Sequence, residues 1–131
     1  MNSPTLANKV AIVTGAGNGI GRAISITFAA AGAAVACVDV DGKAAEETAR
    51  TITESGGRAR ALRCDVSAET DTRAAVEAAQ SAFGAIHILV NGAANDDPNG
   101  TVLDLTPAQW DRVFAVNVTG AYLMSRAFCR P

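Results

Sequence analysis

Four short runs of apolar residues divide the chain, at positions 10–14, 34–39, 59–64 and 86–91. The first, second and fourth runs are nearly continuous in Val, Ile, Leu, Ala and Cys. Continuous runs of this length are typical of strands that helices cover on both faces. Arg60 and Arg63 interrupt the third run. The pattern therefore predicts four strands, with the third at an outer position of the sheet.

Helical spacing separates these runs, because apolar side chains recur there at steps of three and four residues. The three stripes consist of Ile20, Ile24, Phe28 and Ala31; of Ala44, Ala45, Thr48 and Ile52; and of Thr72, Val76, Ala79 and Phe83. A glycine follows each stripe, at Gly32, Gly56 and Gly84, and glycine is a common helix stop. Strands that alternate with such helices predict βαβ units and a parallel sheet.

A longer helix with two apolar stripes is predicted at residues 107–130, after a polar loop at 93–100. Thr106 and Pro107 fit an N-cap followed by proline at the first helical position. One stripe consists of Trp110, Phe114, Asn117, Ala121, Met124 and Phe128, and the other of Val113, Val116, Gly120, Leu123 and Ala127. One stripe must cover the sheet. We expect the other to pack against a further helix, from this chain or from a partner subunit.

The composition fits one globular domain spanning residues 1–131. Of the 131 residues, 49% are hydrophobic and 18% are charged, which excludes a disordered chain. The net charge of −2 gives no basic footprint for nucleic acid. No apolar run is long enough to span a bilayer, and residues 1–10 do not resemble a signal peptide. We therefore expect a cytoplasmic protein without membrane or nucleic-acid partners.

The three cysteines and the one histidine are expected to be structural. Cys37, Cys64 and Cys129 are odd in number and widely spaced, unlike a disulfide framework or a zinc site. We expect buried or half-buried thiols. His87 starts the fourth predicted strand, at the end opposite the crevice in which parallel α/β sheets bind ligands. The sequence thus indicates no metal site.

Candidate chemistry is concentrated at residues 14–21, between the first strand and the first helix. The stretch reads Thr-Gly-Ala-Gly-Asn-Gly-Ile-Gly. Glycines there allow a tight turn and the close approach of a pyrophosphate, and the start of the helix offers free N–H groups. Gly15, Gly19 and Gly21 are spaced Gly-x-x-x-Gly-x-Gly, with Ile20 where the commonest fingerprint needs glycine. We predict a dinucleotide-binding turn; a tight turn without a ligand is the alternative.

An acidic residue, Asp39, ends the second predicted strand. A carboxylate at this place accepts hydrogen bonds from the ribose hydroxyls of NAD and repels the 2′-phosphate of NADP. Asn18 stands in the turn without a basic side chain, and neither neighbour of Asp39 is Lys or Arg. The sequence therefore predicts NAD in preference to NADP. An aspartate that only caps a turn is the alternative.

These features resemble the short-chain dehydrogenase/reductase family, over essentially the whole chain. Residues 14–21 match its T-G-x-x-x-G-I-G cofactor motif, and Asp65-Val66 matches its D-V pair, whose Asp contacts the adenine amino group. Residues 89–94 match its L-V-N-N-A-G stretch in part, since Gly92 and Ala94 differ. The resemblance implies a cofactor site made by Gly15, Asn18, Gly19, Ile20, Gly21, Asp39, Asp65, Val66, Asn91 and Ala93.

The resemblance also implies a fold and a reaction. The fold is a Rossmann-type doubly wound parallel sheet with helices on both faces, here incomplete, with strand order 3-2-1-4. The reaction is NAD(P)-dependent hydride transfer between a small-molecule secondary alcohol and a ketone. In the family the helix at 107–130 joins a dimer interface, so a homo-oligomer is expected.

Asn117 matches the asparagine of the family's Asn-Ser-Tyr-Lys tetrad, which holds a water that relays protons. This residue interrupts an apolar stripe, so we expect a buried amide that needs hydrogen-bond partners. A core asparagine bonded to nearby backbone is the alternative to the catalytic role.

The family's catalytic Ser and Tyr-x-x-x-Lys have no equivalent in these 131 residues. Tyr122 is the one tyrosine, and Arg126 stands at the offset of the lysine. This pair is not expected to be catalytic, because Tyr122 points away from Asn117 around the helix and arginine cannot titrate as lysine does. Residues 86–90 would also form an open apolar edge. We expect the N-terminal, cofactor-binding half of a dehydrogenase, inactive by itself; an inactive dinucleotide-binding or interaction module, or a pseudogene product, is the alternative.

Overall fold

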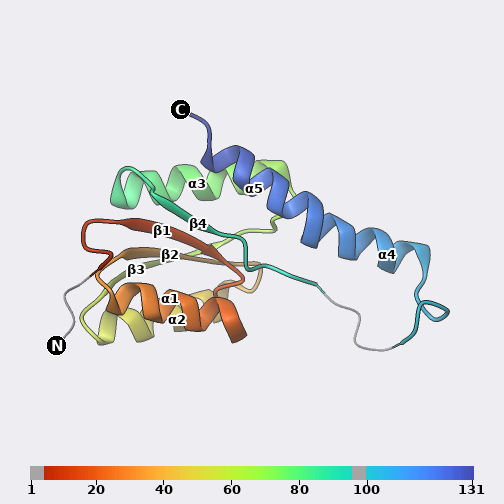
Figure 1. Cartoon of the computed structure of the whole chain (residues 1–131), viewed down its shortest axis with the longest axis horizontal. Helices are drawn as coiled ribbons and strands as arrows, with labels where there is room; N and C mark the ends of the chain where they lie inside the picture. The colour runs from red at the N-terminus through yellow and green to blue at the C-terminus, as the bar shows by residue number, and fades with distance from the viewer. Residues whose placement is uncertain (1–4, 96–99) are drawn as a thin grey trace.

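Four parallel strands form a single sheet in the order β3-β2-β1-β4 (Figure 1). The computed structural model describes residues 5–95 and 100–131. The strands are β1 (Val10–Thr14), β2 (Ala34–Asp39), β3 (Arg58–Arg63) and β4 (Ile88–Val90). The predicted order and the outer position of the third run are confirmed. Residues 1–4, and positions 96–99 of the predicted loop, lie outside the described residues.

Helices lie on both faces of the sheet, as expected for a doubly wound fold (Figure 1). α1 (Gly19–Ala30) and α2 (Gly42–Glu54) cover one face. α3 (Glu69–Phe83) and the C-terminal helical segment cover the other. That segment consists of α4 (Pro107–Phe114), a π-helical turn η1 (Ala115–Thr119) and α5 (Gly120–Phe128). The predicted Rossmann-type parallel sheet with helices on both faces is thus confirmed.

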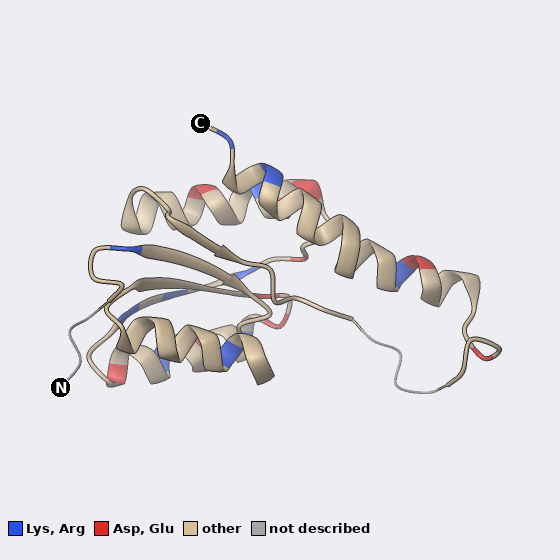
Figure 2. Ribbon diagram, in the orientation of Figure 1, with Lys and Arg blue, Asp and Glu red and all other residues tan. Residues whose placement is uncertain are grey.

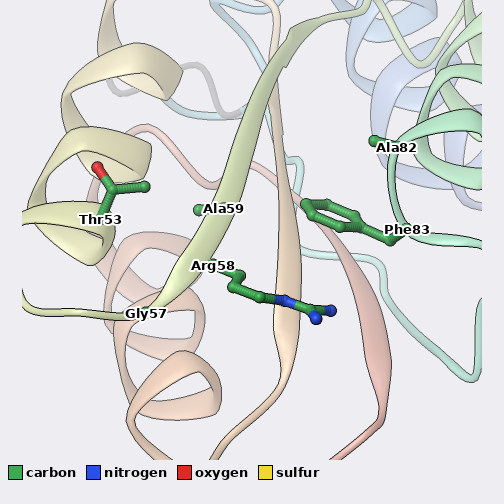
Figure 3. A pocket seen from close by; sticks show the side chains of 6 residues that line it. All are labelled: Thr53, Gly57, Arg58, Ala59, Ala82 and Phe83. Carbon is green, nitrogen blue, oxygen red and sulfur yellow. The ribbon is translucent and has the colours of Figure 1, made fainter.

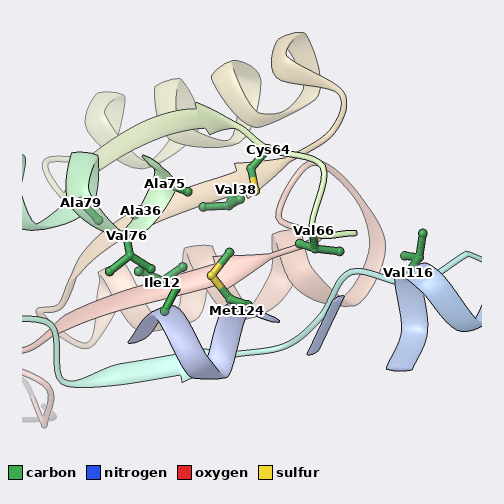
Figure 4. Packing of buried hydrophobic residues seen from close by; sticks show 11 residues of the cluster. Ile12, Ala36, Val38, Cys64, Val66, Ala75, Val76, Ala79, Val116 and Met124 are labelled. Atoms are coloured by element: carbon green, nitrogen blue, oxygen red, sulfur yellow. The ribbon is translucent and has the colours of Figure 1, made fainter. Parts of the chain in front are cut away.

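The core divides into two layers, because successive side chains of a strand point to opposite faces of the sheet. In β1, Ile12 packs toward α3 and α5, where Val76 and Met124 meet it (Figure 4). Its neighbour Val13 packs toward α1 and α2, together with Ile52. β1 and β2 are buried along their whole apolar length. The continuous apolar runs therefore reflect cover on both faces.

Local signals set the ends of the helices. Thr106 caps α4 in a reciprocal capping box: its hydroxyl accepts from the Gln109 N–H at 3.2 Å, and the Gln109 side chain accepts from the Thr106 N–H at 2.8 Å. The Asp41 side chain caps α2 by accepting from the Ala44 N–H. Gly84 ends α3 at a φ of 83°, a conformation that glycine adopts without strain.

The C-terminal segment differs from the uniform helix predicted at residues 107–130. The π-helical turn η1 interrupts it, and α5 ends at Phe128. Because a π turn bonds residue i to i+5, it rotates the residues that follow it about the helix axis. Trp110 and Phe114 are nevertheless exposed because α4 buries no residue on any face, whereas Met124 of the same predicted stripe lies in α5 and is fully buried.

The predicted structural roles hold for His87 and for two of the three cysteines. The His87 N–H donates to the Val10 carbonyl at 2.9 Å, and its Nδ1 accepts from the Val10 N–H at 3.0 Å. Cys37 and Cys64 are buried, and burial raises the pKa of these thiols to about 11 and about 12. Cys129 is exposed. The prediction was wrong for Cys129, because this residue follows the last residue of α5.

Acidic and basic residues are scattered over the helices, and arginines also lie on β3 (Figure 2). One ion pair joins α5 to the first turn of α3, where Arg126 Nη1 lies 3.7 Å from Glu69 Oε1. Within residues 5–95 and 100–131, no helix combines the length and the apolar character that crossing a membrane requires.

Candidate functional site

A cleft of about 600 Å³ opens at the carboxyl ends of the strands. Its lining includes nine of the ten predicted cofactor residues, namely Gly15, Asn18, Gly19, Ile20, Gly21, Asp39, Asp65, Val66 and Ala93. The tenth, Asn91, is exposed next to it, and its side-chain Nδ2 donates to Ser125 Oγ of α5 at 3.2 Å. The fold thus brings together residues that are spread over most of the chain.

A second hollow, of about 450 Å³, lies where β3 begins, with Arg58 and Phe83 in its wall (Figure 3). The Arg58 guanidinium carbon is 5.7 Å from the centre of the Phe83 ring. This hollow is at the amino end of a parallel strand. Ligands of open α/β sheets bind outside the carboxyl ends, so the cleft beside the glycine-rich turn is the candidate site.

Two glycines of the turn have backbone conformations that other residues rarely adopt. Gly15 has a φ of 67° and Gly19 a φ of 54°. A Cβ on Gly15 would lie 2.5 Å from the Gly92 carbonyl oxygen, so glycine lets the turn and the segment after β4 approach closely. At Gly19, apart from its two chain neighbours and the backbone of its own helix, no heavy atom of the described residues lies within 4 Å of such a Cβ. The turn therefore leaves open space beside the cleft.

The start of α1 points free N–H groups at this space. The first N–H groups of a helix have no intrahelical acceptor. In the part of the chain that the structure describes, the Asn18 side chain does not cap them and the first turn holds no acidic residue. Ile20, the first residue of the predicted apolar stripe, is 80% exposed and lines the cleft. This end of α1 suits an anion.

Asp39 combines a turn-capping role with a place in the cleft wall. Its Oδ2 accepts from the Gly17 N–H at 2.8 Å, and its Oδ1 accepts from the Asp41 N–H at 2.9 Å. The carboxylate thus caps the turns on either side of it, as the alternative interpretation expected. Each carboxylate oxygen has a second lone-pair direction, so capping leaves the group able to accept a further hydrogen bond.

Asp65 is held by groups that stabilise its ionised form. Its Oδ1 accepts from the Ser67 hydroxyl at 2.6 Å and from the Ser67 N–H at 3.0 Å. Arg112 Nη1 of α4 lies 3.9 Å from Asp65 Oδ2. The Ser67 hydroxyl has the largest effect, and together with the Ser67 N–H and the charge of Arg112 it lowers the pKa of Asp65. Sequence reasoning missed Arg112, which also lines the cleft.

Thr14 ties the glycine-rich turn to the segment after β4. Its hydroxyl oxygen accepts from the N–H groups of Gly92 and Ala93, each at 3.0 Å. Thr14 is buried, so these bonds are shielded from water. Thr14 begins the glycine-rich motif at residues 14–21, but the motif alone does not indicate this contact.

Asn117 lies in η1 and is exposed, which corrects the prediction of a buried amide. Its Oδ1 accepts from the Asn95 N–H at 2.7 Å, and its Nδ2 donates to the Asn95 carbonyl at 2.9 Å. It therefore fixes the segment after β4 against the helix. The physical reason for its exposure is that α4 and η1 extend past the end of the sheet (Figure 1).

Tyr122 is 58% exposed, and the cleft lining that the structure describes does not include it. The Arg126 guanidinium lies 3.4 Å from the Tyr122 hydroxyl, and the same nitrogen faces Glu69 at 3.7 Å. The pair thus lies on the outer surface of α5, away from the glycine-rich turn.

The sequence of the chain is similar to that of known dehydrogenases over most of its length. The chain is 40% identical to (3R)-3-hydroxyacyl-CoA dehydrogenase of Mus musculus over 93% of its length, and 40% identical to 7alpha-hydroxysteroid dehydrogenase of Escherichia coli K12 over 92%. It covers 50% and 47% of these relatives, so it spans about half their length.

The fold is also similar to that of a solved structure. The 3-ketoacyl-(acyl-carrier-protein) reductase of Brucella melitensis, complexed with NADH, superposes with a TM-score of 0.90 at 42% identity. The match covers 95% of this chain and 50% of that one. The family model for short chain dehydrogenase matches residues 9–131. With this match and the fold and cleft described above, the chain belongs to the short chain dehydrogenase family of oxidoreductases.

Proposed function

We propose that this chain is the cofactor-binding half of an NAD(H)-dependent oxidoreductase that interconverts a secondary alcohol and a ketone. The observation that carries the proposal is one cleft in which the uncapped start of α1 and the Asp39 carboxylate lie together. The two relatives named above are, by their names, dehydrogenases of hydroxylated compounds. The chain spans about half the length of these relatives, so substrate and activity are part of the proposal.

The cleft residues fit a dinucleotide in three places. The start of α1 would hold the pyrophosphate, because its N–H groups and the positive end of the helix dipole complement an anion. Gly19 leaves space for such a group. Asp65 and the buried Val66 would hold the adenine, and Asn91 and Ala93, after β4, would lie toward the nicotinamide half.

Asp39 would select NAD over NADP. Its carboxylate would accept hydrogen bonds from the ribose hydroxyls and repel a phosphate in their place. No cation offsets this charge within 4.0 Å among the ion pairs of residues 5–95 and 100–131. The bound cofactor would accept or deliver the hydride.

Asn117 is proposed as the chain's contribution to proton transfer. Its amide makes one bond through each polar atom to Asn95, which leaves one acceptor direction and one N–H for a water. Its place in a π-helical turn supports this role, since such turns occur often at functional sites.

The C-terminal helices are proposed as a homo-oligomer surface. Trp110, Phe114, Val118 and Tyr122 form the exposed apolar stripe, with exposed fractions of 45% to 58%. The Trp110 and Phe114 rings stack with their centres 4.9 Å apart. A run of large exposed apolar side chains on one helix face favours association.

Cofactor titrations test the proposal. We expect the purified chain to bind NADPH about tenfold more weakly than NADH, a difference of about 1.4 kcal/mol. Asp39→Ala should bring the two affinities close together, because it removes the charge that repels the 2′-phosphate. Asp104→Ala, which removes an exposed carboxylate outside the cleft, should keep the NADH preference. Equal affinities for the unmutated chain would overturn the assignment.

A further inference from the structure

A buried hydroxyl on α2 contacts the glycine-rich turn. Thr48 is fully buried, and its Oγ1 donates to the Ala16 carbonyl at 2.8 Å. Ala16 is also fully buried, so water cannot replace this bond. A buried carbonyl without a partner is strongly unfavourable, and Thr48 therefore restrains the direction of the Ala16 carbonyl.

Arg22 sets the direction of this hydrogen bond. Its Nη1 donates to Thr48 Oγ1 at 3.1 Å, and a guanidinium group can only donate. The Thr48 hydroxyl therefore accepts from Arg22 and directs its own proton to a carbonyl. The Ala16 carbonyl at 2.8 Å is closer than that of Ala44 at 3.3 Å. The positive charge of Arg22 strengthens the bond that reaches the turn.

The same peptide group is also held from its other side. The Ala16 carbonyl and the Gly17 N–H belong to one rigid, planar peptide unit, and the Gly17 N–H donates to Asp39 Oδ2 at 2.8 Å. Thr48 and Asp39 thus clamp this peptide between them. If the peptide flipped, its carbonyl oxygen would face the Asp39 carboxylate, so the orientations of the turn and of Asp39 depend on each other.

We propose that Thr48 is a positioning residue for dinucleotide recognition. By holding the Ala16–Gly17 peptide, it keeps Asp39 and the start of α1 in the arrangement that binds NADH and discriminates against NADPH. This inference rests on the proposed function. It adds a residue of α2 that lies outside the cleft lining as described.

Three variants distinguish the effect of the Thr48 hydroxyl on the glycine-rich turn from the effect of Thr48 on core packing. Thr48→Val keeps the shape of the side chain and removes the hydroxyl, whereas Thr48→Ser restores the hydroxyl without the methyl group. Thr51→Val is the matched control: Thr51 also accepts from Arg22, at 3.3 Å, but its hydroxyl donates to Glu47 of its own helix at 2.9 Å. Circular dichroism establishes that each variant is folded.

Two measurements test whether Thr48 holds the Ala16–Gly17 peptide. Without ligand, amide hydrogen exchange at Gly17 should be about tenfold faster in Thr48→Val than in the unmutated chain. With ligand, NADH should bind about tenfold more weakly to Thr48→Val, and the NADH-to-NADPH preference should narrow. Thr48→Ser should restore both properties, and Thr51→Val should behave like the unmutated chain.

The inference is overturned by unchanged Gly17 exchange in folded Thr48→Val, or by a Thr48→Ser variant as impaired as Thr48→Val. If the unmutated chain binds no NADH, the proposed function fails and the recognition role fails with it. If the unmutated chain and Thr48→Val bind NADH equally, only the inference fails. If Thr48→Val does not fold, Arg22→Met removes the cation and keeps the hydroxyl. Unchanged Gly17 exchange in that variant would show only that the Thr48 hydroxyl holds the Ala16 carbonyl without the charge of Arg22; a folded Thr48→Ala variant, which also removes the hydroxyl, with unchanged Gly17 exchange and NADH affinity would overturn the inference.

Discussion

Two carboxylates at neighbouring strand ends differ in what holds them. Asp39 accepts two backbone N–H groups, which leaves its charge beside the cleft. Asp65 accepts from the Ser67 hydroxyl and faces Arg112. These neighbours suit the two carboxylates to different parts of a dinucleotide. Asp39, whose charge faces no cation within 4.0 Å among the described residues, suits ribose hydroxyls, and Asp65, which Ser67 orients, suits an adenine amino group.

The lowered pKa of Asp65 predicts a pH dependence of stability. A group whose pKa is lower in the folded state stabilises the fold above its unfolded pKa and loses this contribution as the pH falls through the folded pKa. Asp65→Asn should therefore be less stable than the unmutated chain at about pH 7, and the difference should shrink below about pH 4. Because Asp65 is solvated, the effect at neutral pH should stay below about 1 kcal/mol.

Urea unfolding at the two pH values measures this difference. Glu77→Gln, which neutralises an exposed carboxylate on α3, is the charge-matched control. A difference between Asp65→Asn and the unmutated chain that grows as the pH falls would contradict the assigned role of Ser67.

The sequence predicted correctly that some residues would lie together at the cleft. Gly15, Gly19 and Asp39 could be placed there because a strand, a tight turn and a helix follow one another along the chain. Thr48 and Arg112 could not be identified as contacts of the turn and of Asp65. Their partners lie on other elements, and the Arg112–Ser67 contact spans 45 positions. Only the folded sheet brings such groups together.

Among the helices and strands, too, some could be predicted from the sequence and others could not. β1 and β2 begin and end where their apolar runs predict, because both strands are covered on two faces. The π-helical turn η1 could not be seen in the spacing of apolar residues, since it adds one residue to a turn without changing the composition. The predicted stripe is exposed at Trp110 because α4 buries no residue, and it is buried at Met124 because α5 packs in the core beside α3.

The exposed apolar stripe predicts self-association of the chain. At tens of micromolar, light scattering should detect dimers or larger species rather than a monomer. Phe114→Asp should weaken association at least about tenfold, because it places a charge in the centre of the stripe. Ala108→Asp adds the same charge to an exposed position outside the stripe and should leave association unchanged. A monodisperse monomer of the unmutated chain would contradict the proposed surface.

At the scale of the whole molecule, the described sheet ends at β4, which pairs with β1 and is half-buried. The relatives that match are about twice as long. These 131 residues hold the cleft that we propose as the cofactor site, whereas their one tyrosine is exposed on α5.

The 131-residue polypeptide is therefore predicted to bind cofactor without turnover. Positioned proton transfer contributes roughly 10²–10⁴-fold to such reactions, and Tyr122 lies outside the cleft lining, beside Arg126. NADH absorbance should stay constant when the chain is mixed with NAD and a panel of secondary alcohols. Sustained turnover that disappears in Tyr122→Phe would show that the Tyr122–Arg126 pair is catalytic after all.

The most direct test of the account is to locate bound NADH on the isotope-labelled chain by NMR. The account predicts that adding NADH shifts the amide resonances of Gly19, Asp39, Val66 and Ala93, which line the cleft. It also predicts that the amides of Arg58 and Phe83, in the hollow at the other end of the sheet, keep their positions. Shifts confined to Arg58 and Phe83, or no shifts at the glycine-rich turn, would contradict it.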